Sequence, residues 1–412
     1  MMSEVRAMSR CRTVFAVGLA LEIVAVIAVL ATDLHHGIDL DVYRLGGHAW
    51  LTGQPLYGQL PPTTIGVTLP FTYPPLAAVL FSPLALIPRW LAVALVLAVS
   101  FGALAFTLHL VVRRAADWFL GWAPAAVVAV ALPLLTGFEP VRETLTFGQV
   151  NLVLMALVAA DCLLPSTRWP RGTLIGIAAA IKLTPAAFLL FFLVRKDFRA
   201  AVTSGVVFLL AVASGFLLAG ADSLRYWRST FLDADRAGNP TFASNQSLRG
   251  ALVRLGLPGA TVQLLWVVLA VAVVVVGWVA IRRLLGTGLP GAEPLAVAAN
   301  ATVALLVSPV SWSHHWVWAT PCLVLLFGLA VRTRDRGLAI ACLLASAVFA
   351  IGPQWLVPNR YYVELRWNLG QHLVGDLYVL TGLAFLVACC VLPARLLRPP
   401  GRPAGRPSPA GR

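Results

Sequence analysis

The stretch Thr261-Val-Gln-Leu-Leu-Trp-Val-Val-Leu-Ala-Val-Ala-Val-Val-Val-Val-Gly-Trp-Val-Ala-Ile281 contains no charged residue. As an α-helix it is long enough to cross the roughly 30 Å hydrocarbon core of a bilayer. Comparable apolar stretches recur from Val14 to Leu392 in this chain of 412 residues, of which 59% are hydrophobic and only 12% are charged. Because a water-soluble domain of this size cannot bury so much apolar surface, the sequence predicts an all-α polytopic membrane protein.

The basic residues lie in short clusters between the apolar stretches, for example Arg113-Arg114, Arg195-Lys196 and Arg282-Arg283. The positive-inside rule assigns these clusters and the Arg-rich C-terminal tail to the cytoplasm. We therefore expect full spans near 14–32, 90–112, 119–136, 148–164, 201–220, 261–281, 294–309, 316–331, 337–352 and 372–392. The polar segments left on the outer face are 33–89, 137–147, 221–260, 310–315 and 353–371, and within the first of these we expect a short apolar helix from Pro74 to Pro88 on the membrane face.

One apolar segment, 173–194, does not fit as a simple span, because Arg171 before it and Arg195 after it both favour the cytoplasm. Its centre, Lys182-Leu-Thr-Pro185, introduces a charge and a helix breaker. We expect two half-helices that form a hairpin from the cytoplasmic side. With these halves, about ten to twelve transmembrane helices form a single integral membrane domain over residues 1–392. The Pro/Gly/Arg-rich tail, 393–412, is expected to be a disordered cytoplasmic extension.

The net charge of +14 could indicate a nucleic-acid-binding protein. Because the basic clusters flank apolar spans, we instead expect membrane lipids as their partners and no nucleic acid. The first apolar run is as long as a full span, so we interpret it as an uncleaved signal anchor in the plasma membrane. The six cysteines show no CxxC or Cys/His spacing, so neither disulfides nor a zinc site are expected.

A polar break follows the first span: Ile38-Asp-Leu-Asp-Val-Tyr-Arg44. We interpret it as a loop, in which alternation would direct Asp39 and Asp41 differently, so that at most one serves as a base. A partly buried carboxylate can accept a proton from an attacking hydroxyl group. Tyr43 and Arg44 are candidate substrate contacts. Helix capping, pairing with Arg44 or simple hydration is the structural alternative for both aspartates.

A second polar segment runs from Ser308 to Trp318 and contains Trp312, His314 and His315. Adjacent histidines could bind a metal, but their side chains diverge and no third ligand lies at the usual spacing, so no metal is expected. The tryptophans could form an interfacial belt. Aromatic rings beside imidazoles also suit a sugar, since rings stack on its apolar face and polar groups bind its edge. We favour substrate binding, with one histidine orienting a phosphate or hydroxyl.

Arginines are frequent in the segments that the positive-inside rule places outside, where basic residues are normally depleted. Anionic substrate or lipid headgroups could account for them. We single out Arg142 and Arg249, the latter just after Asn245-Gln246, as phosphate contacts. The full set is Arg44, Arg89, Arg142, Arg225, Arg228, Arg236, Arg249, Arg254, Arg360 and Arg366.

Three further polar residues, Gln149, Asn151 and Lys182, lie at or inside apolar segments. Polar groups at such depth usually face a cavity or the interior of a helix bundle. For Gln149 and Asn151, hydrogen bonding between helices is an equally good interpretation. For Lys182 we expect an anionic partner.

Taken together, these segments resemble glycosyltransferase family 87. The similar segments are Asp39–Tyr43, Gly53–Tyr57, Leu69–Pro75, Phe147–Asn151, Lys182–Pro185 and Ser308–Trp316. The resemblance implies a GT-C type membrane fold with a long first extracytoplasmic loop. It implies a catalytic aspartate in that loop, at Asp39 or Asp41, a histidine of the site at His314 or His315, and Tyr73 of the third segment as a substrate contact.

This family comprises polyprenyl-phosphate-mannose-dependent mannosyltransferases of actinobacteria, and within it the sequence most resembles the α-(1→2)-mannosyltransferases. The resemblance implies an inverting transfer, at the extracytoplasmic face, from that lipid to a mannose hydroxyl of a growing lipoglycan, forming the α-1,2 branches of lipomannan or lipoarabinomannan. The lipid donor already carries its sugar, so no further cofactor is expected, and no Gly-rich phosphate loop is present. Two alternatives are a mannosyltransferase acting on phosphatidylinositol mannosides and a transporter or flippase of a lipid-linked sugar.

Overall fold

The computed structural model describes residues 37–233, 236, 238–289 and 291–391, together with Val17, Gly18, Ala20 and Val24. Throughout these residues the regular structure is helical, and the only β contact among them is an isolated bridge between Asn245 and Trp312. The predicted all-α class is therefore confirmed. The predicted span near 14–32, apart from the four residues named, and the tail 393–412 lie outside the described residues.

Among the described residues, four helices are long and apolar enough to cross a membrane: α4 (Arg89–Arg114), α10 (Phe198–Leu218), α13 (Gly259–Gly286) and the continuous stretch Ser313–Thr333. This last stretch consists of the 3₁₀ helix η5 (Ser313–Trp318) and α15 (Ala319–Thr333). The four helices match the spans predicted near 90–112, 201–220, 261–281 and 316–331. On α10 and α13 many apolar side chains are exposed, and Leu217 is 88% exposed. Apolar surface on this scale requires hydrocarbon as its solvent.

Two predicted spans are bent pairs of helices, which corrects the expectation of straight spans near 119–136 and 372–392. In the first, α5 (Pro124–Thr136) and α6 (Glu139–Phe147) meet at 74°, because Gly137 ends α5 and Pro140, in the first turn of α6, cannot continue the preceding helix. In the second, α17 (Leu369–Gly375) and α18 (Leu377–Val391) meet at 67°. Asp376 lies at this break and forms an ion pair with the fully buried Arg254.

The remaining predicted spans are shorter apolar helices. They are α7 (Asn151–Leu163), α14 (Ala292–Val307) and α16 (Arg336–Ile351), in place of full spans near 148–164, 294–309 and 337–352. Nearly all of α14 is buried, so it forms the centre of the helix bundle, in contact with α13 on one side and α15 on another. Each predicted span within the described residues thus corresponds to a helix or a bent pair, although several are shorter than expected.

The predicted hairpin consists of α8 (Thr173–Ile181), a break at Lys182-Leu183, the short helix η2 (Thr184–Phe188) and α9 (Leu189–Arg195). Gly172, just before α8, lies against the start of α10, where an added Cβ would be only 2.1 Å from the carbonyl oxygen of Ala200. Since α10 follows α9 directly, both ends of the hairpin lie at the same end of the molecule. Lys182 is at its vertex.

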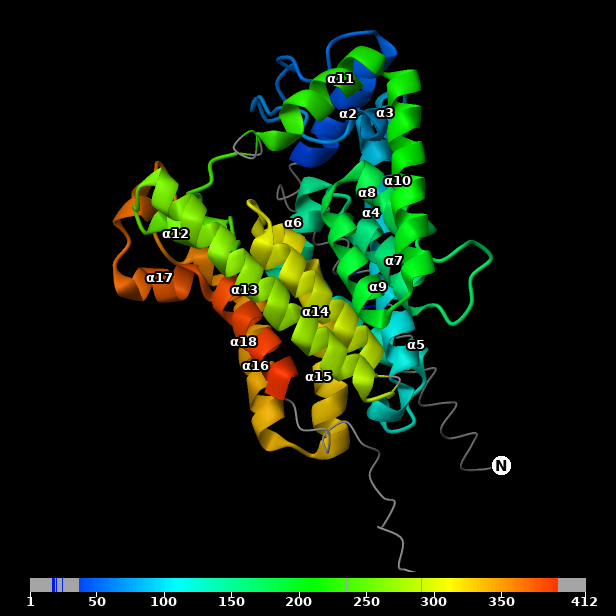
Figure 1. Cartoon of the computed structure of the whole chain (residues 1–412), viewed down its shortest axis with the longest axis vertical. Helices are drawn as coiled ribbons and strands as arrows, with labels where there is room; N and C mark the ends of the chain where they lie inside the picture. Colours follow the sequence, from blue (N-terminus) through cyan, green and yellow to red (C-terminus); the bar gives the residue numbers. More distant parts are fainter. Residues whose placement is uncertain are drawn as a thin grey trace, which may run out of the picture.

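The polar connections also contain helices, labelled in Figure 1 where they are large enough: α2 (Ile38–Leu51), α3 (Pro75–Ala85), α11 (Gly220–Arg228) and α12 (Leu248–Arg254). Short 3₁₀ turns are η1 (Ala116–Phe119), η3 (Thr230–Leu232), η6 (Pro353–Trp355) and η7 (Val363–Arg366). In Figure 1, α2, α3 and α11 gather at the top, whereas α15 and α16 turn at the bottom. The apolar helix expected from Pro74 to Pro88 is α3.

The segment interpreted as a loop around Asp39 and Asp41 is in fact α2. Gly37 starts this helix in the left-handed conformation, and the two carboxylates lie in the first turn, where the helix dipole favours negative charge. Leu40 and Val42 are buried. The expectation of a loop is wrong because burial of these apolar residues stabilises a helix at this position.

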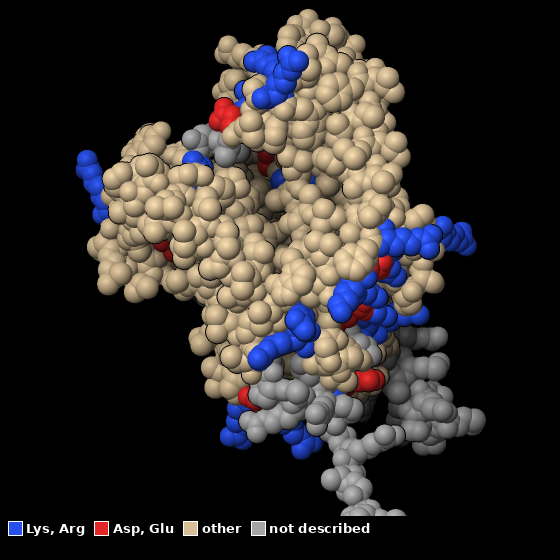
Figure 2. Space-filling model, viewed as in Figure 1, with Lys and Arg blue, Asp and Glu red and all other residues tan. Residues whose placement is uncertain are grey.

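Most of the visible Lys and Arg side chains lie in the lower half of the molecule (Figure 2). This half contains the ends of helices that carry Arg113-Arg114, Arg195-Lys196 and Arg282-Arg283. The clusters that the positive-inside rule assigns to the cytoplasm thus lie toward one end of the molecule.

Candidate active site

A cavity of about 780 Å³ lies between α2, the segment leading into α3, the vertex of the hairpin, the η3 region and the turn before α15. In Figure 2 a hollow opens between the surface over α11 and the surface over α12. The lining residues that bear on the chemistry are Asp39, Tyr73, Gln149, Lys182, Asp233, Arg236, Phe242, Trp312, His314, His315 and Trp355. Segments that are far apart in the sequence thus meet at one site.

Asp39 is the cavity-lining carboxylate of α2. Burial raises its pKa to about 6, although the charge of Lys182 and a hydrogen bond from Gln149 both act to lower it. A carboxylate with this pKa is mostly ionised at neutral pH and is also a stronger base than an ordinary aspartate. Asp233 also lines the cavity but is exposed.

The orientation of Gln149 is fixed by two tyrosines. Its Nε2 donates to the hydroxyl of Tyr73 at 3.0 Å, and its Oε1 accepts from the hydroxyl of Tyr43. Tyr43 is only 2% exposed and stacks on Phe81 at 4.3 Å between ring centroids. Tyr43, a predicted substrate contact, therefore lies behind the cavity wall and holds Gln149 toward Asp39.

Asp41 does not line the cavity. Two residues along a helix the side chain points about 200° away, so Asp39 and Asp41 face opposite directions. The Asp41 carboxylate is 2.9 Å from Nε of Arg89 and accepts a 2.6 Å hydrogen bond from Oγ1 of Thr64. These contacts tie α2 to α4 and to the long outer loop, which leaves Asp39 as the candidate base.

Lys182 connects the hairpin to the histidine turn. Its Nζ donates to Oδ1 of Asn151 at 3.0 Å and lies 3.1 Å from Nε2 of His315. Because an ammonium group has no acceptor, Nε2 of His315 accepts, and the neutral ring carries its proton on Nδ1. Asn151 does not line the large cavity but an adjoining pocket of about 60 Å³, which Lys182, Thr184 and His315 share.

The backbone of the histidine turn is held by donors from two helices. The carbonyl oxygen of His314 accepts from Oγ1 of Thr144 and from Nδ2 of Asn151, each at 2.9 Å. The His314 ring meets Phe147 edge-on, with its Nδ1 buried and without a partner among the described residues. A polar atom in this state at a cavity wall is a candidate for a substrate hydrogen bond.

Asn245 and Gln246, predicted as substrate contacts, lie behind this turn and are fully buried. Oδ1 of Asn245 accepts from the backbone N–H of Ser311 at 3.0 Å, and the backbone N–H of Gln246 donates to the carbonyl of Ser311 at 2.7 Å. Neither residue lines the cavity. The structure places them as supports of the turn that presents Trp312 and the histidines.

The three arginines selected from the sequence also lie outside the cavity lining. Arg44 donates to the carbonyls of Leu84, in the last turn of α3, and of Ile87, just beyond that helix. Arg142 donates to the carbonyl of Gly137 and lies 3.8 Å from Glu143. Arg249 belongs to α12. Their proximity to other polar residues in the sequence did not indicate proximity to the site.

Arg236 is the arginine that lines the cavity. Its Nε is buried without a partner among the described residues, and its guanidinium lies 5.8 Å from the ring centroid of Tyr57. A guanidinium with a free donor beside a cavity is suited to a phosphate. Arg236 is one of the outer arginines predicted from the sequence, but no neighbouring pattern distinguishes it from the others.

Three aromatic side chains, Trp312, Phe242 and Trp355, form one wall of the cavity. The ring centroids of Phe242 and Trp312 are 6.3 Å apart, and those of Phe242 and Trp355 are 5.8 Å apart. Such a surface can stack on the apolar face of a sugar ring. Trp312 was predicted from the sequence, whereas Phe242 and Trp355 were missed.

Within the described residues, no group of three or more His, Cys, Asp or Glu side chains is arranged so that it could hold a metal ion.

Comparisons with known proteins give consistent results. The model of glycosyltransferase family 87 matches residues 71–309. A protein of Mycolicibacterium smegmatis named polyprenol-phosphate-mannose-dependent alpha-(1-2)-phosphatidylinositol mannoside mannosyltransferase is 41% identical over 85% of this chain and 82% of its own length. The Mycobacterium tuberculosis protein of the same name is 40% identical over 85% of this chain and 83% of its own length.

A more distant relative is the polyprenol-phosphate-mannose-dependent alpha-(1-2)-phosphatidylinositol pentamannoside mannosyltransferase of Mycolicibacterium smegmatis. It is 33% identical over 85% of this chain and 84% of its own length. No solved structure matches the chain.

Proposed function

Because this chain belongs to glycosyltransferase family 87, we propose that its cavity transfers mannose from polyprenyl-phosphate mannose to a hydroxyl of a mannosylated phosphatidylinositol. Both relatives at 40–41% identity are named for this donor and for phosphatidylinositol mannoside as acceptor. The observation that carries the proposal is the meeting of Asp39, Lys182 and the aromatic wall in one cavity.

Asp39 is the proposed catalytic base. As the acceptor hydroxyl attacks the anomeric carbon of mannose, the ionised carboxylate takes its proton. The attack comes from the face opposite the phosphate, so the bond between the anomeric carbon and the phosphate oxygen breaks while the new glycosidic bond forms. A β-linked donor then gives an α-mannoside. Gln149 orients Asp39 for this step through its hydrogen bond.

The departing polyprenyl phosphate carries the negative charge that develops in the transfer. Lys182 and Arg236, both in the cavity wall, are proposed to stabilise this charge. A phosphate is a weak base, so it can leave without being protonated. His315 already accepts from Lys182, and it therefore fixes the ammonium group rather than acting as an acid.

The relatives' names support a phosphatidylinositol mannoside as acceptor more directly than a lipoglycan. Branching of lipomannan or lipoarabinomannan stays a prediction. We further propose that the enzyme is a multi-pass protein of the plasma membrane with the cavity at the extracytoplasmic face. The basic clusters at the opposite end of the molecule support this orientation.

The proposal is tested with purified protein in liposomes that contain radiolabelled polyprenyl-phosphate mannose. Phosphatidylinositol mannosides and lipomannan are offered separately as acceptors, and linkage analysis of the products identifies the new bond. We expect a 2-linked mannose on the phosphatidylinositol mannoside. Transfer only to lipomannan would move the acceptor to the lipoglycan. Movement of the labelled lipid between leaflets without any glycosidic bond would contradict the enzymatic function and favour a transporter.

A further inference from the structure

A second pocket, of about 580 Å³, lies at the end of the molecule opposite the catalytic cavity. It is formed by the ends of α4, α9 and α13 and the start of α14. Helix α4 connects the two ends: Arg89 at its start pairs with Asp41 of α2, and Arg114 at its end lines this pocket. At 1.5 Å per residue, the two arginines are about 37 Å apart. The pocket is therefore separate from the site of mannose transfer.

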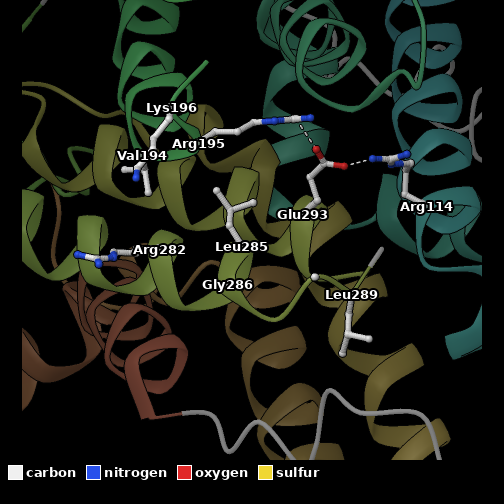
Figure 3. A pocket seen from close by; sticks show the side chains of 10 residues that line it. Arg114, Val194, Arg195, Lys196, Arg282, Leu285, Gly286, Leu289 and Glu293 are labelled. Carbon is white, nitrogen blue, oxygen red and sulfur yellow. Dashed lines mark hydrogen bonds and ion pairs between the residues drawn. The ribbon is translucent and has the colours of Figure 1, made fainter. Parts of the chain in front are cut away.

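Positive charge dominates the pocket. Arg114, Arg195, Lys196 and Arg282 line it, against the single carboxylate of Glu293. Figure 3 shows Glu293 between the guanidinium groups of Arg195 and Arg114, with which it forms two ion pairs. One carboxylate cannot neutralise four cations, so the pocket retains a net positive charge at neutral pH.

Donors in the pocket remain available. Nε of Arg114 is buried without a partner among the described residues. Lys196 and Arg282 are exposed, and neither has an ion pair in the described part of the chain. In Figure 3 both lie on the other side of Leu285 from Glu293. Lys196 and Arg282 therefore keep charged donors that an anionic ligand can accept from.

The remaining lining is apolar. Val194, Leu285 and Leu289 contribute side chains, and Figure 3 shows Leu285 directed into the space beneath Arg195. A free phosphate ion needs no such wall, whereas a phospholipid can place its glycerol and the start of an acyl chain there. Basic pockets between transmembrane helices on the cytoplasmic side are suited to phosphate-bearing lipid headgroups.

We propose that this pocket binds a phosphate-bearing anion, supplied by an anionic phospholipid or by a soluble phosphate compound. The bound phosphate accepts from Lys196 and Arg282, which lie on the same side of Leu285. Because Lys196 follows the end of the hairpin whose vertex is Lys182, and Arg282 belongs to α13, the anion ties the hairpin to α13. This role does not depend on the identity of the sugar acceptor.

The test uses the full-length protein, delipidated in a neutral detergent, and isothermal titration calorimetry. The probes are dihexanoyl phosphatidylglycerol, dihexanoyl phosphatidylcholine and inorganic phosphate. The variant is Lys196→Gln/Arg282→Gln, which leaves both ion pairs of Glu293 intact. The matched control is Arg199→Gln/Arg336→Gln, two exposed arginines that also follow basic clusters but do not line the pocket. All three proteins are compared by thermal melting to ensure that they fold.

We expect the wild-type protein and the control to bind phosphatidylglycerol, and the pocket variant to bind it about 30-fold more weakly, since each cation near an anionic headgroup contributes about 1 kcal/mol. Competition by inorganic phosphate would identify soluble phosphate as a sufficient ligand, and its failure to compete would identify the lipid. Equal affinity of the pocket variant and the control, or equal affinity for phosphatidylcholine and phosphatidylglycerol, would overturn the proposal. Mannose transfer is not the readout, so failure here is distinguishable from failure of the proposed enzymatic function.

Discussion

Nζ of Lys182 lies 3.1 Å from Nε2 of His315 and joins the vertex of a broken hairpin to the turn that opens α15. The two residues are far apart in the sequence, and each belongs to a segment that is polar in an apolar setting. Their contact brings a cation to the same cavity as Asp39. An inverting transfer from a phosphate needs a base for the incoming hydroxyl and positive charge for the departing phosphate.

Asp39→Asn should reduce mannose transfer by about 10²- to 10⁴-fold, the usual contribution of a general base, because an amide cannot accept the proton of the acceptor hydroxyl. The measurement is the rate of transfer from polyprenyl-phosphate mannose, normalised to the amount of folded protein.

The matched control for this substitution is Asp41→Asn, on the same helix. Asp41 pairs with Arg89 outside the cavity, so its loss should lower the melting temperature and leave turnover of the folded protein nearly unchanged. If Asp41→Asn stops transfer and Asp39→Asn does not, the roles of the two carboxylates are reversed.

The pH dependence of kcat/KM should reflect Asp39. Burial raises its pKa to about 6, and the base is active only when ionised, so the rate should rise with pH through about 6 and level off above about 7.

The charge of Lys182 lowers the pKa of Asp39. Lys182→Met should therefore move the midpoint to higher pH, in addition to any loss of rate from its contact with the phosphate. An unchanged midpoint in this variant would show that another group controls the profile.

Arg236→Gln should raise the KM for polyprenyl-phosphate mannose by about 10- to 100-fold, because a hydrogen bond to a charged group contributes about 1.5–3 kcal/mol. The matched control is Arg249→Gln, also in an outer segment but not in the cavity lining, for which we expect an unchanged KM. Initial rates at varied donor concentration separate KM from kcat. Equal effects of the two substitutions would indicate that surface charge in general attracts the donor.

Much of the fold follows from residue patterns that act locally. Uninterrupted apolar stretches such as 261–281 form buried or lipid-facing helices, and the charge of Lys182 together with Pro185 marks the break within 173–194. The bend between α17 and α18 was not predicted, because it depends on a distant partner. The break at Asp376 is stabilised by Arg254, which lies more than a hundred residues earlier in the chain.

The candidate site was predictable to the extent that its polar residues stand out against apolar surroundings. Asp39, Lys182 and Trp312 were identified in this way, and all three line the cavity. Asn245 was equally conspicuous, but its side chain bonds to the backbone of Ser311. Only the tertiary structure separates a polar residue that faces a cavity from one that supports its wall. Arg236 was not distinguished for the same reason, since other outer arginines resemble it in sequence.

Gly148 provides a test of how Asp39 is positioned. Its φ of +68° is in the left-handed region, and an added Cβ would lie 2.8 Å from Cβ of Leu40 on α2. Gly148→Ala should therefore cost about 1–2 kcal/mol in backbone strain and push α2 away from Gln149. The hydrogen bond from Gln149 lowers the pKa of Asp39, so its loss should move the pH midpoint upward as kcat falls.

The matched control is Gly102→Ala on α4, where an added Cβ meets nothing within 4 Å and helix propensity favours alanine. A lower melting temperature for Gly148→Ala with an unchanged pH profile would mean that Gln149 does not set the basicity of Asp39.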